Sequence, residues 1–128
     1  MISIIIPTFN RNVQLKQCIQ SIRDNSAFEN EIIVLHPFVD QQTIDLCNEM
    51  KVNHQNDNSR VNGKRVKSLW GIINDGIELA SFSKVCWLND DCLVLKDWDK
   101  YALNYFENSI GLVILKTKGL DEIGRAHV

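Results

Sequence analysis

A chain of 128 residues is long enough for one compact domain with a hydrophobic core and too short for two. Apolar residues make up 45% of it, which argues against disorder. The net charge of −2 argues against a general nucleic-acid binder, which would carry a basic surplus. We therefore expect any phosphate-binding site to be local.

The cysteines and the apolar runs bear on cellular location. Cys18, Cys47 and Cys86 lie among apolar neighbours and outside any C-x-x-C pair, so we interpret them as core residues in a reducing compartment. Cys92, beside an acidic pair, is left open. No stretch resembles a signal peptide or approaches the ~20 residues of a membrane span. We expect a cytoplasmic protein, and leave open peripheral attachment to the inner face of the membrane through sequence outside this chain.

The first part of the chain alternates strand and helix patterns. Residues 2–6 are a β-branched run that ends at Pro7, typical of a strand buried on both faces. A helix follows, for which Asn10 can provide the cap. Its apolar positions recur at helical spacing: Leu15, Cys18, Ile19 and Ile22. A second buried strand is expected over residues 31–35.

The alternation continues to the end of the chain. Asp40 can cap a short helix, and a short third strand is expected over residues 52–54. Residues 53–64 are polar and without periodicity, which predicts a loop. The remaining expected elements are a helix over residues 66–80, a strand over 84–88, a helix around 98–105 and a strand over 110–115.

This order predicts an α/β fold with a Rossmann-like, mostly parallel sheet and helices on both faces. Ligands in such folds bind beyond the carboxyl ends of the strands. That rule selects four segments: residues 7–11, 36–40, 53–64 and 89–92.

We expect residues 1–118 to form one incomplete domain, followed by a tail over residues 119–128. Residues 123–128, Ile-Gly-Arg-Ala-His-Val, can be encoded by ATC GGA AGA GCA CAC GTC. That string is similar to the start of a common short-read sequencing adapter. We favour read-through into adapter over a natural tail, and interpret function from residues 1–118.

Two polar segments carry the candidate chemistry. Asp90 and Asp91 follow a buried strand, where adjacent carboxylates repel each other unless a cation or donors lie between them, and Mg²⁺ or Mn²⁺ with a diphosphate would meet that need. The alternative is an exposed acidic turn or a helix cap. After the first strand, Thr8 and Phe9 can contact a base, and Arg11 at a helix start can meet phosphate. The alternative there is an ordinary strand-to-helix turn.

Three stretches together resemble the family 2 glycosyltransferases of the GT-A fold. They are Ser3-Ile4-Ile5-Ile6-Pro7-Thr8-Phe9-Asn10-Arg11, Asn74-Asp75-Gly76-Ile77-Glu78-Leu79-Ala80 and Val85-Cys86-Trp87-Leu88-Asn89-Asp90-Asp91. The resemblance runs from residue 1 to about residue 115 and implies the nucleotide-binding half of that fold, truncated. It implies an inverting, Mn²⁺- or Mg²⁺-assisted transfer from a UDP- or dTDP-type sugar donor to an unassigned acceptor glycan or lipid-linked sugar.

The resemblance also assigns roles to residues. Asn89, Asp90 and Asp91 occupy the D-x-D position, so Asp91 would bind the metal while Asp90 and Asn89 contact the donor. Asn89 keeps an oxygen ligand but loses a charge relative to the family pattern. The base-binding turn would comprise Pro7, Thr8 and Phe9, with Arg11 toward the phosphates.

The remaining assignments are looser. Lys64 and Arg65 lie near the basic part of the donor pocket, or else begin the next helix. His36 stands where the family usually has an Asp that reads a uracil-type base, and Asp40 serves as a helix cap. The family's catalytic base lies in the acceptor half, beyond this chain's last residue, so no catalytic residue is assigned.

Two other functions are alternatives for this chain. A nucleotidyltransferase would need a glycine-rich basic loop after the first strand, and residues 7–14 contain no glycine. A non-enzymatic nucleotide-binding or interaction module, with the acidic pair as a turn, is the alternative from a different class.

Overall fold

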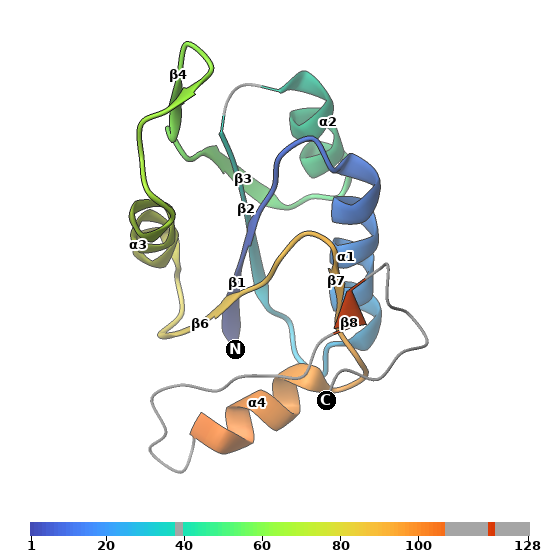
Figure 1. The fold of residues 1–128 in the computed structure, drawn as a ribbon. Coiled ribbons are helices and arrows are strands. Elements are labelled where there is room, and N and C mark those ends of the chain that lie inside the picture. The colour runs from blue at the N-terminus through green and yellow to red at the C-terminus, as the bar shows by residue number, and fades with distance from the viewer. Residues whose placement is uncertain (38–39, 107–117, 120–128) are drawn as a thin grey trace.

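A parallel sheet forms the centre of the molecule (Figure 1). The computed structural model describes residues 1–37, 40–106 and 118–119. Its elements are β1 (Ile2–Pro7), α1 (Asn12–Asn25), β2 (Glu31–His36), α2 (Gln41–Glu49), β3 (Asn53–Asn56), β4 (Arg60–Val61), β5 (Lys64–Arg65), α3 (Leu69–Leu79), β6 (Lys84–Trp87), β7 (Cys92–Leu93), α4 (Trp98–Phe106) and β8 (Lys118–Gly119). The central strands lie in the order β3-β2-β1-β6, and every pairing among them is parallel. The predicted α/β class is confirmed.

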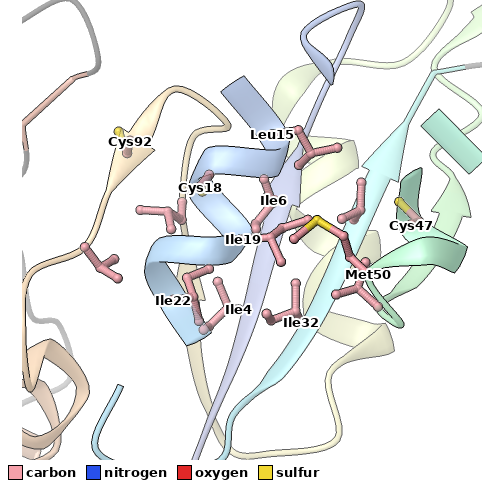
Figure 2. Close-up of a cluster of buried hydrophobic side chains, with 14 of the residues drawn as sticks. Ile4, Ile6, Leu15, Cys18, Ile19, Ile22, Ile32, Cys47, Met50 and Cys92 are labelled. Carbon is pink, nitrogen blue, oxygen red and sulfur yellow. The ribbon is translucent and has the colours of Figure 1, made fainter. Parts of the chain in front are cut away.

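The sheet is covered on both faces, which explains the unbroken isoleucine run of β1. Successive strand residues point to opposite faces, so Ile4 and Ile6 pack against α1 while Ile5 packs toward Ile72 of α3. Figure 2 shows the larger cluster, where the apolar face of α1 meets the sheet. Its labelled members are Ile4, Ile6, Leu15, Cys18, Ile19, Ile22, Ile32, Cys47, Met50 and Cys92.

The cysteines behave as small core residues. Cys18 and Cys47 are fully buried, as predicted, and Cys86 packs against the same cluster. Burial raises the pKa of Cys18 to about 12 and the pKa values of Cys47 and Cys86 to about 11. All three are therefore neutral thiols at physiological pH. The sequence did not decide whether Cys92 is a core residue, and the structure buries it on β7.

The predicted loop over residues 53–64 is wrong in part. Strand β3 extends to Asn56, and β4 pairs with β5 as an antiparallel hairpin. Its tip, Asn62-Gly63, has positive φ at both residues, 52° and 77°, as a two-residue hairpin of this twist requires. Asn-Gly is the sequence signal for such a turn, but the flanking strands are only two residues long and show no alternation from which a hairpin could be predicted.

Helix starts differ from expectation at two places. Asn10 does not cap α1: it adopts a left-handed conformation, φ 54°, and Arg11 is the N-cap residue. Helix α3 begins at Leu69 with Ser68 as its cap, so Lys64 and Arg65 form a strand and not a helix start. Asp40 does cap α2, accepting a hydrogen bond from the Gln42 amide at 3.1 Å.

Two expectations fall on residues that the structure does not describe. The last predicted strand, residues 110–115, lies there, as does the proposed adapter-derived segment, residues 123–128. The domain boundary at residue 118 stays a prediction. Among the helices of the described ranges, none has both the length and the apolar character needed to cross a membrane.

Gly76 is where α3 lies close against the sheet. A Cβ added there would lie 2.9 Å from Cγ2 of Ile5, a stiff β-branched side chain that is fully buried. We expect Gly76→Ala to lower the free energy of unfolding by about 1–2 kcal/mol, because overpacking outweighs the gain in helix propensity. Urea unfolding would measure the change.

Gly71→Ala in the same helix is the matched control. Its added Cβ would lie 2.8 Å from Cγ of Lys67, but this side chain is unbranched and part-exposed, whereas Ile5 is branched and buried, so we expect a smaller effect. A Gly76→Ala protein as stable as the wild type would show that α3 does not need glycine to approach the sheet.

Candidate functional site

The ends of β1 and β6 meet at the carboxyl edge of the sheet. Because these strands are parallel neighbours, the turn after β1 lies beside the turn after β6. The Thr8 hydroxyl donates a hydrogen bond to Oδ2 of Asp90 at 2.9 Å, joining residues 82 positions apart in the chain. The Cys92 amide donates to the Asn89 carbonyl at 3.2 Å, which closes the acidic segment into a tight turn.

Arg11 connects the same two turns through its charge. Its Nη1 atom lies 3.4 Å from Oδ1 of Asp90 and 3.5 Å from Oδ2 of Asp91. The left-handed residue Asn10 turns the chain here, and Arg11 then begins α1. One cationic group therefore lies between the two adjacent carboxylates, which offsets the repulsion expected from the sequence.

Asp90 is the buried member of the pair, with 5% of its surface exposed. Burial raises the pKa of Asp90 above its ordinary value of 3.8; the Thr8 hydrogen bond and the Arg11 charge oppose this rise, while Asp91 adds to it. The folded protein thus holds this proton more tightly than the unfolded chain does. The stability that Asp90 contributes is present at low pH and is lost as pH rises through the folded pKa.

Asp91 is the residue best placed to hold a divalent metal. Its side chain is 42% exposed, and carboxylate oxygens are ligands that Mn²⁺ and Mg²⁺ prefer. Within the described ranges, no three His, Cys, Asp or Glu side chains converge to form a ready cage. Mg²⁺ is often bound through one or two carboxylates with substrate phosphates completing the shell. In the structure Asp91 is paired with Arg11 instead, so a metal bound there would have to displace that contact.

A pocket of about 290 Å³ opens at this edge of the sheet. It is lined by Pro7, Thr8, Phe9, Arg11, Pro37, Asp57, Ser59, Arg60, Arg65, Leu69, Ile72 and Asp90. Hollows of about 390 and 500 Å³ lie instead along β2 and β3, around the amino ends of those strands. The smaller pocket is the one at the carboxyl ends, where ligands of parallel α/β folds bind.

Six of the residues selected from the sequence line this pocket: Pro7, Thr8, Phe9, Arg11, Arg65 and Asp90. Asn89 and Asp91 belong to the adjoining turn, and Lys64 lies on the exposed hairpin next to Arg65. The structure thus gathers the turns after β1 and β6, together with the start of α3, around one cavity.

His36 lies away from the pocket lining. Only 4% of its surface is exposed, and its Nε2 atom is 3.1 Å from Nδ1 of His54 on β3. Burial lowers the pKa of His54, and the proximity of His36 lowers it further. The pair joins β2 to β3 and neither ring lines the pocket, so reading of the donor base by His36 stays a prediction.

Sequence reasoning missed the contribution of the segment after β3. Asp57, Ser59 and Arg60 line the pocket, and the Arg60 guanidinium lies 4.8 Å from the centroid of the Phe9 ring. The Asp57 carboxylate accepts a hydrogen bond from the Ser59 amide at 2.8 Å, which shapes the turn. The segment was expected to lie at the ligand-binding edge of the sheet. The sequence did not show that β3 ends at Asn56, so it did not indicate which residues of the segment face the pocket.

Comparisons with known proteins identify the family of the chain. Residues 3–122 match the model of "Glycosyl transferase family 2". A curated relative from Campylobacter jejuni subsp. jejuni serotype O:2, GalNAc(5)-diNAcBac-PP-undecaprenol beta-1,3-glucosyltransferase, is 34% identical over 94 residues, which cover 70% of this chain and 29% of the relative.

Solved structures show the same fold at low sequence identity. S. aureus TarS 1-349 superposes with a TM-score of 0.66 at 18% identity, over 84% of this chain and 32% of TarS 1-349. Its complex with UDP-GlcNAc superposes with a TM-score of 0.65, again at 18% identity, over 84% of this chain and 31% of that one. The chain spans about a third of the length of these proteins. The family model, which covers nearly the whole chain, shows that it belongs to glycosyl transferase family 2.

Proposed function

We propose that this chain is the donor-binding part of a glycosyltransferase that takes a sugar from a nucleoside diphosphate donor of the UDP or dTDP type. The observation that carries the proposal is the convergence of Thr8, Arg11 and Asp90 on one pocket at the carboxyl ends of β1 and β6. The TarS complexes with UDP-GlcNAc and UDP, which share the fold, support this donor class.

Each part of the pocket suits one part of such a donor. Phe9 offers an aromatic ring to the base, and the oxygens of Thr8 and Asp90 can accept hydrogen bonds from the hydroxyls of a ribose or sugar. Arg11, Arg60 and Arg65 supply positive charge for the diphosphate in a chain whose net charge is −2. The phosphate site is local, as the composition requires.

The metal belongs to the same proposal. Asp91 would hold Mn²⁺ or Mg²⁺ against the donor diphosphate, and the metal when bound would neutralise the leaving group. Asn89, in the first position of the motif, would add an uncharged oxygen. Inversion at the sugar carbon and a catalytic base in the acceptor half follow from the family resemblance.

The acceptor is proposed as a glycan or a lipid-linked sugar. The Campylobacter relative, whose name includes a PP-undecaprenol substrate, supports the lipid-linked class. The family assignment disfavours the nucleotidyltransferase, while a non-enzymatic module would bind donor and transfer nothing.

UDP with Mn²⁺ is expected to raise the melting temperature of the chain. At about ten times its Kd, a ligand that binds only the folded state adds about 1.4 kcal/mol, which corresponds to about 4 °C for a domain of this size. UDP alone should give a smaller shift, and Mn²⁺ alone the least. If no nucleoside diphosphate changes the melting temperature, with or without metal, this chain does not contain the proposed donor site.

A further inference from the structure

Four large apolar side chains project into solvent beside the donor pocket. They belong to the β4–β5 hairpin, the segment after it and the start of α3, and each is at least half exposed: Val61, Val66, Leu69 and Trp70. Trp70 is the most exposed of them, at 74%. Scattered exposed apolar residues need no explanation, but a cluster within ten positions of the chain indicates a contact surface.

The same stretch of chain is basic. Residues 58–74 contain four Lys or Arg residues and no Asp or Glu, whereas the remainder of the chain has ten basic and sixteen acidic residues. Lys64 and Arg65 are exposed on β5, while Lys67 forms an ion pair with Asp75. Positive charge is thus concentrated around the exposed apolar group, which we call the basic apolar surface: Val61, Lys64, Arg65, Val66, Leu69 and Trp70.

The fold presents this surface along one edge of the molecule. The hairpin pairs Arg60 with Arg65 and Val61 with Lys64, and its Asn62-Gly63 tip is a tight two-residue turn. Figure 1 shows the hairpin at one extremity of the molecule, with α3 directly following it along the same side.

We propose that the basic apolar surface docks the protein on an anionic phospholipid bilayer. Trp70 and the neighbouring aliphatic side chains would enter the interfacial layer, and Lys64 and Arg65 would meet lipid phosphates. An acidic protein partner would pair with Lys64 and Arg65. It would provide no apolar layer into which the exposed indole of Trp70 could insert.

Docking would also orient the donor site. Arg65 and Leu69 belong to the basic apolar surface and line the pocket as well, so the pocket mouth would lie at the bilayer surface. A lipid-linked acceptor would then meet the donor at the interface, a consequence that rests on the proposed function. Binding to the bilayer itself does not depend on it.

Vesicle co-sedimentation of the full 128-residue chain tests the docking proposal. We expect binding to phosphatidylcholine vesicles that contain about a third phosphatidylglycerol, weakening with added salt, and little binding to phosphatidylcholine alone. Trp70→Ser should reduce binding. Neutralising Lys64 and Arg65 to Gln together should weaken it about 25-fold, since each basic side chain contributes about fivefold.

Leu95→Ser is the matched control, because Leu95 is 63% exposed and lies outside the basic apolar surface. It should bind vesicles like the wild type. Equal loss in Leu95→Ser, or no preference for anionic vesicles, would overturn the proposal, as would Trp70-dependent dimerisation without vesicle binding. The UDP melting shift of Trp70→Ser, expected to be retained, separates failure of docking from failure of the donor site.

Discussion

Asp91→Ala is expected to abolish the Mn²⁺-dependent part of UDP binding while the protein remains folded. Asp91 is the exposed carboxylate at the end of β6, and its side chain is 42% exposed, so its removal leaves the core intact. Loss of one charged ligand costs on the order of 2 kcal/mol, about 30-fold in affinity. Calorimetric titration of UDP with and without Mn²⁺ would measure it, and unchanged affinity in Mn²⁺ would refute the metal assignment.

Arg11→Gln provides the informative comparison. In the wild type the Arg11 guanidinium lies within 3.5 Å of oxygens of both Asp90 and Asp91, where it repels an incoming metal. Without this cation, Mn²⁺ should bind more tightly in the absence of nucleotide, a change that electron paramagnetic resonance of free Mn²⁺ can follow. UDP should bind less tightly, because a phosphate partner is lost. The two variants therefore change metal binding in opposite directions.

Asp99→Ala is expected to lower the free energy of unfolding by about 3–4 kcal/mol. Asp99 is completely buried at the start of α4 and accepts hydrogen bonds from the Ala27 amide at 2.8 Å, the Phe28 amide at 3.0 Å and Nδ2 of Asn30 at 2.9 Å. These donors belong to the loop between α1 and β2, so one carboxylate holds that loop against α4. Removing it leaves three part-buried donors without their acceptor, and each lost hydrogen bond to a charged group costs about 1–2 kcal/mol.

Asp45→Ala is the control for Asp99→Ala. Asp45 is an exposed acceptor within α2, from Gln41 at 2.7 Å, and its loss should change stability by no more than about 0.5 kcal/mol. Chemical unfolding would compare the variants. An Asp99→Ala protein as stable as Asp45→Ala would show that the loop holds its position without the carboxylate.

The same residue should give stability a pH dependence. Burial alone would raise the pKa of Asp99, but the hydrogen bonds from Ala27, Asn30 and Phe28 outweigh it and hold the pKa below 3.8. The stabilisation is therefore fully present above the unfolded value of 3.8 and is lost as pH falls through the folded pKa. Stability of wild type and Asp99→Asn should thus converge on going from about pH 6 to about pH 3; a constant difference would contradict this account.

Much of the fold could be predicted from local patterns. The isoleucine run of β1 and the helical spacing of Leu15 to Ile22 were sufficient because burial on both faces of a strand and on one face of a helix leaves direct marks in sequence. The same logic located the acidic turn at the end of a strand. It failed at the β4–β5 hairpin, where two-residue strands are too short to show alternation.

The contents of the pocket were less predictable. Arg60 reaches Phe9, and Asp57 and Ser59 join the lining, because β3 continues to Asn56 and delivers its carboxyl end to the same edge. Burial of His36 depends likewise on the His54 ring that β3 places beside it. Neither contact leaves a mark in local periodicity.

The sequence by itself therefore determined the α/β class, the edge of the sheet that carries the site, and the candidate carboxylates Asp90 and Asp91. Tertiary structure decided how those groups are held: Thr8 and Arg11 reach Asp90 across about eighty positions of chain, and Asp99 holds a loop some seventy positions away. Local patterns report burial and backbone conformation one element at a time. Contacts between distant residues depend on strand order and register, which only the assembled sheet establishes.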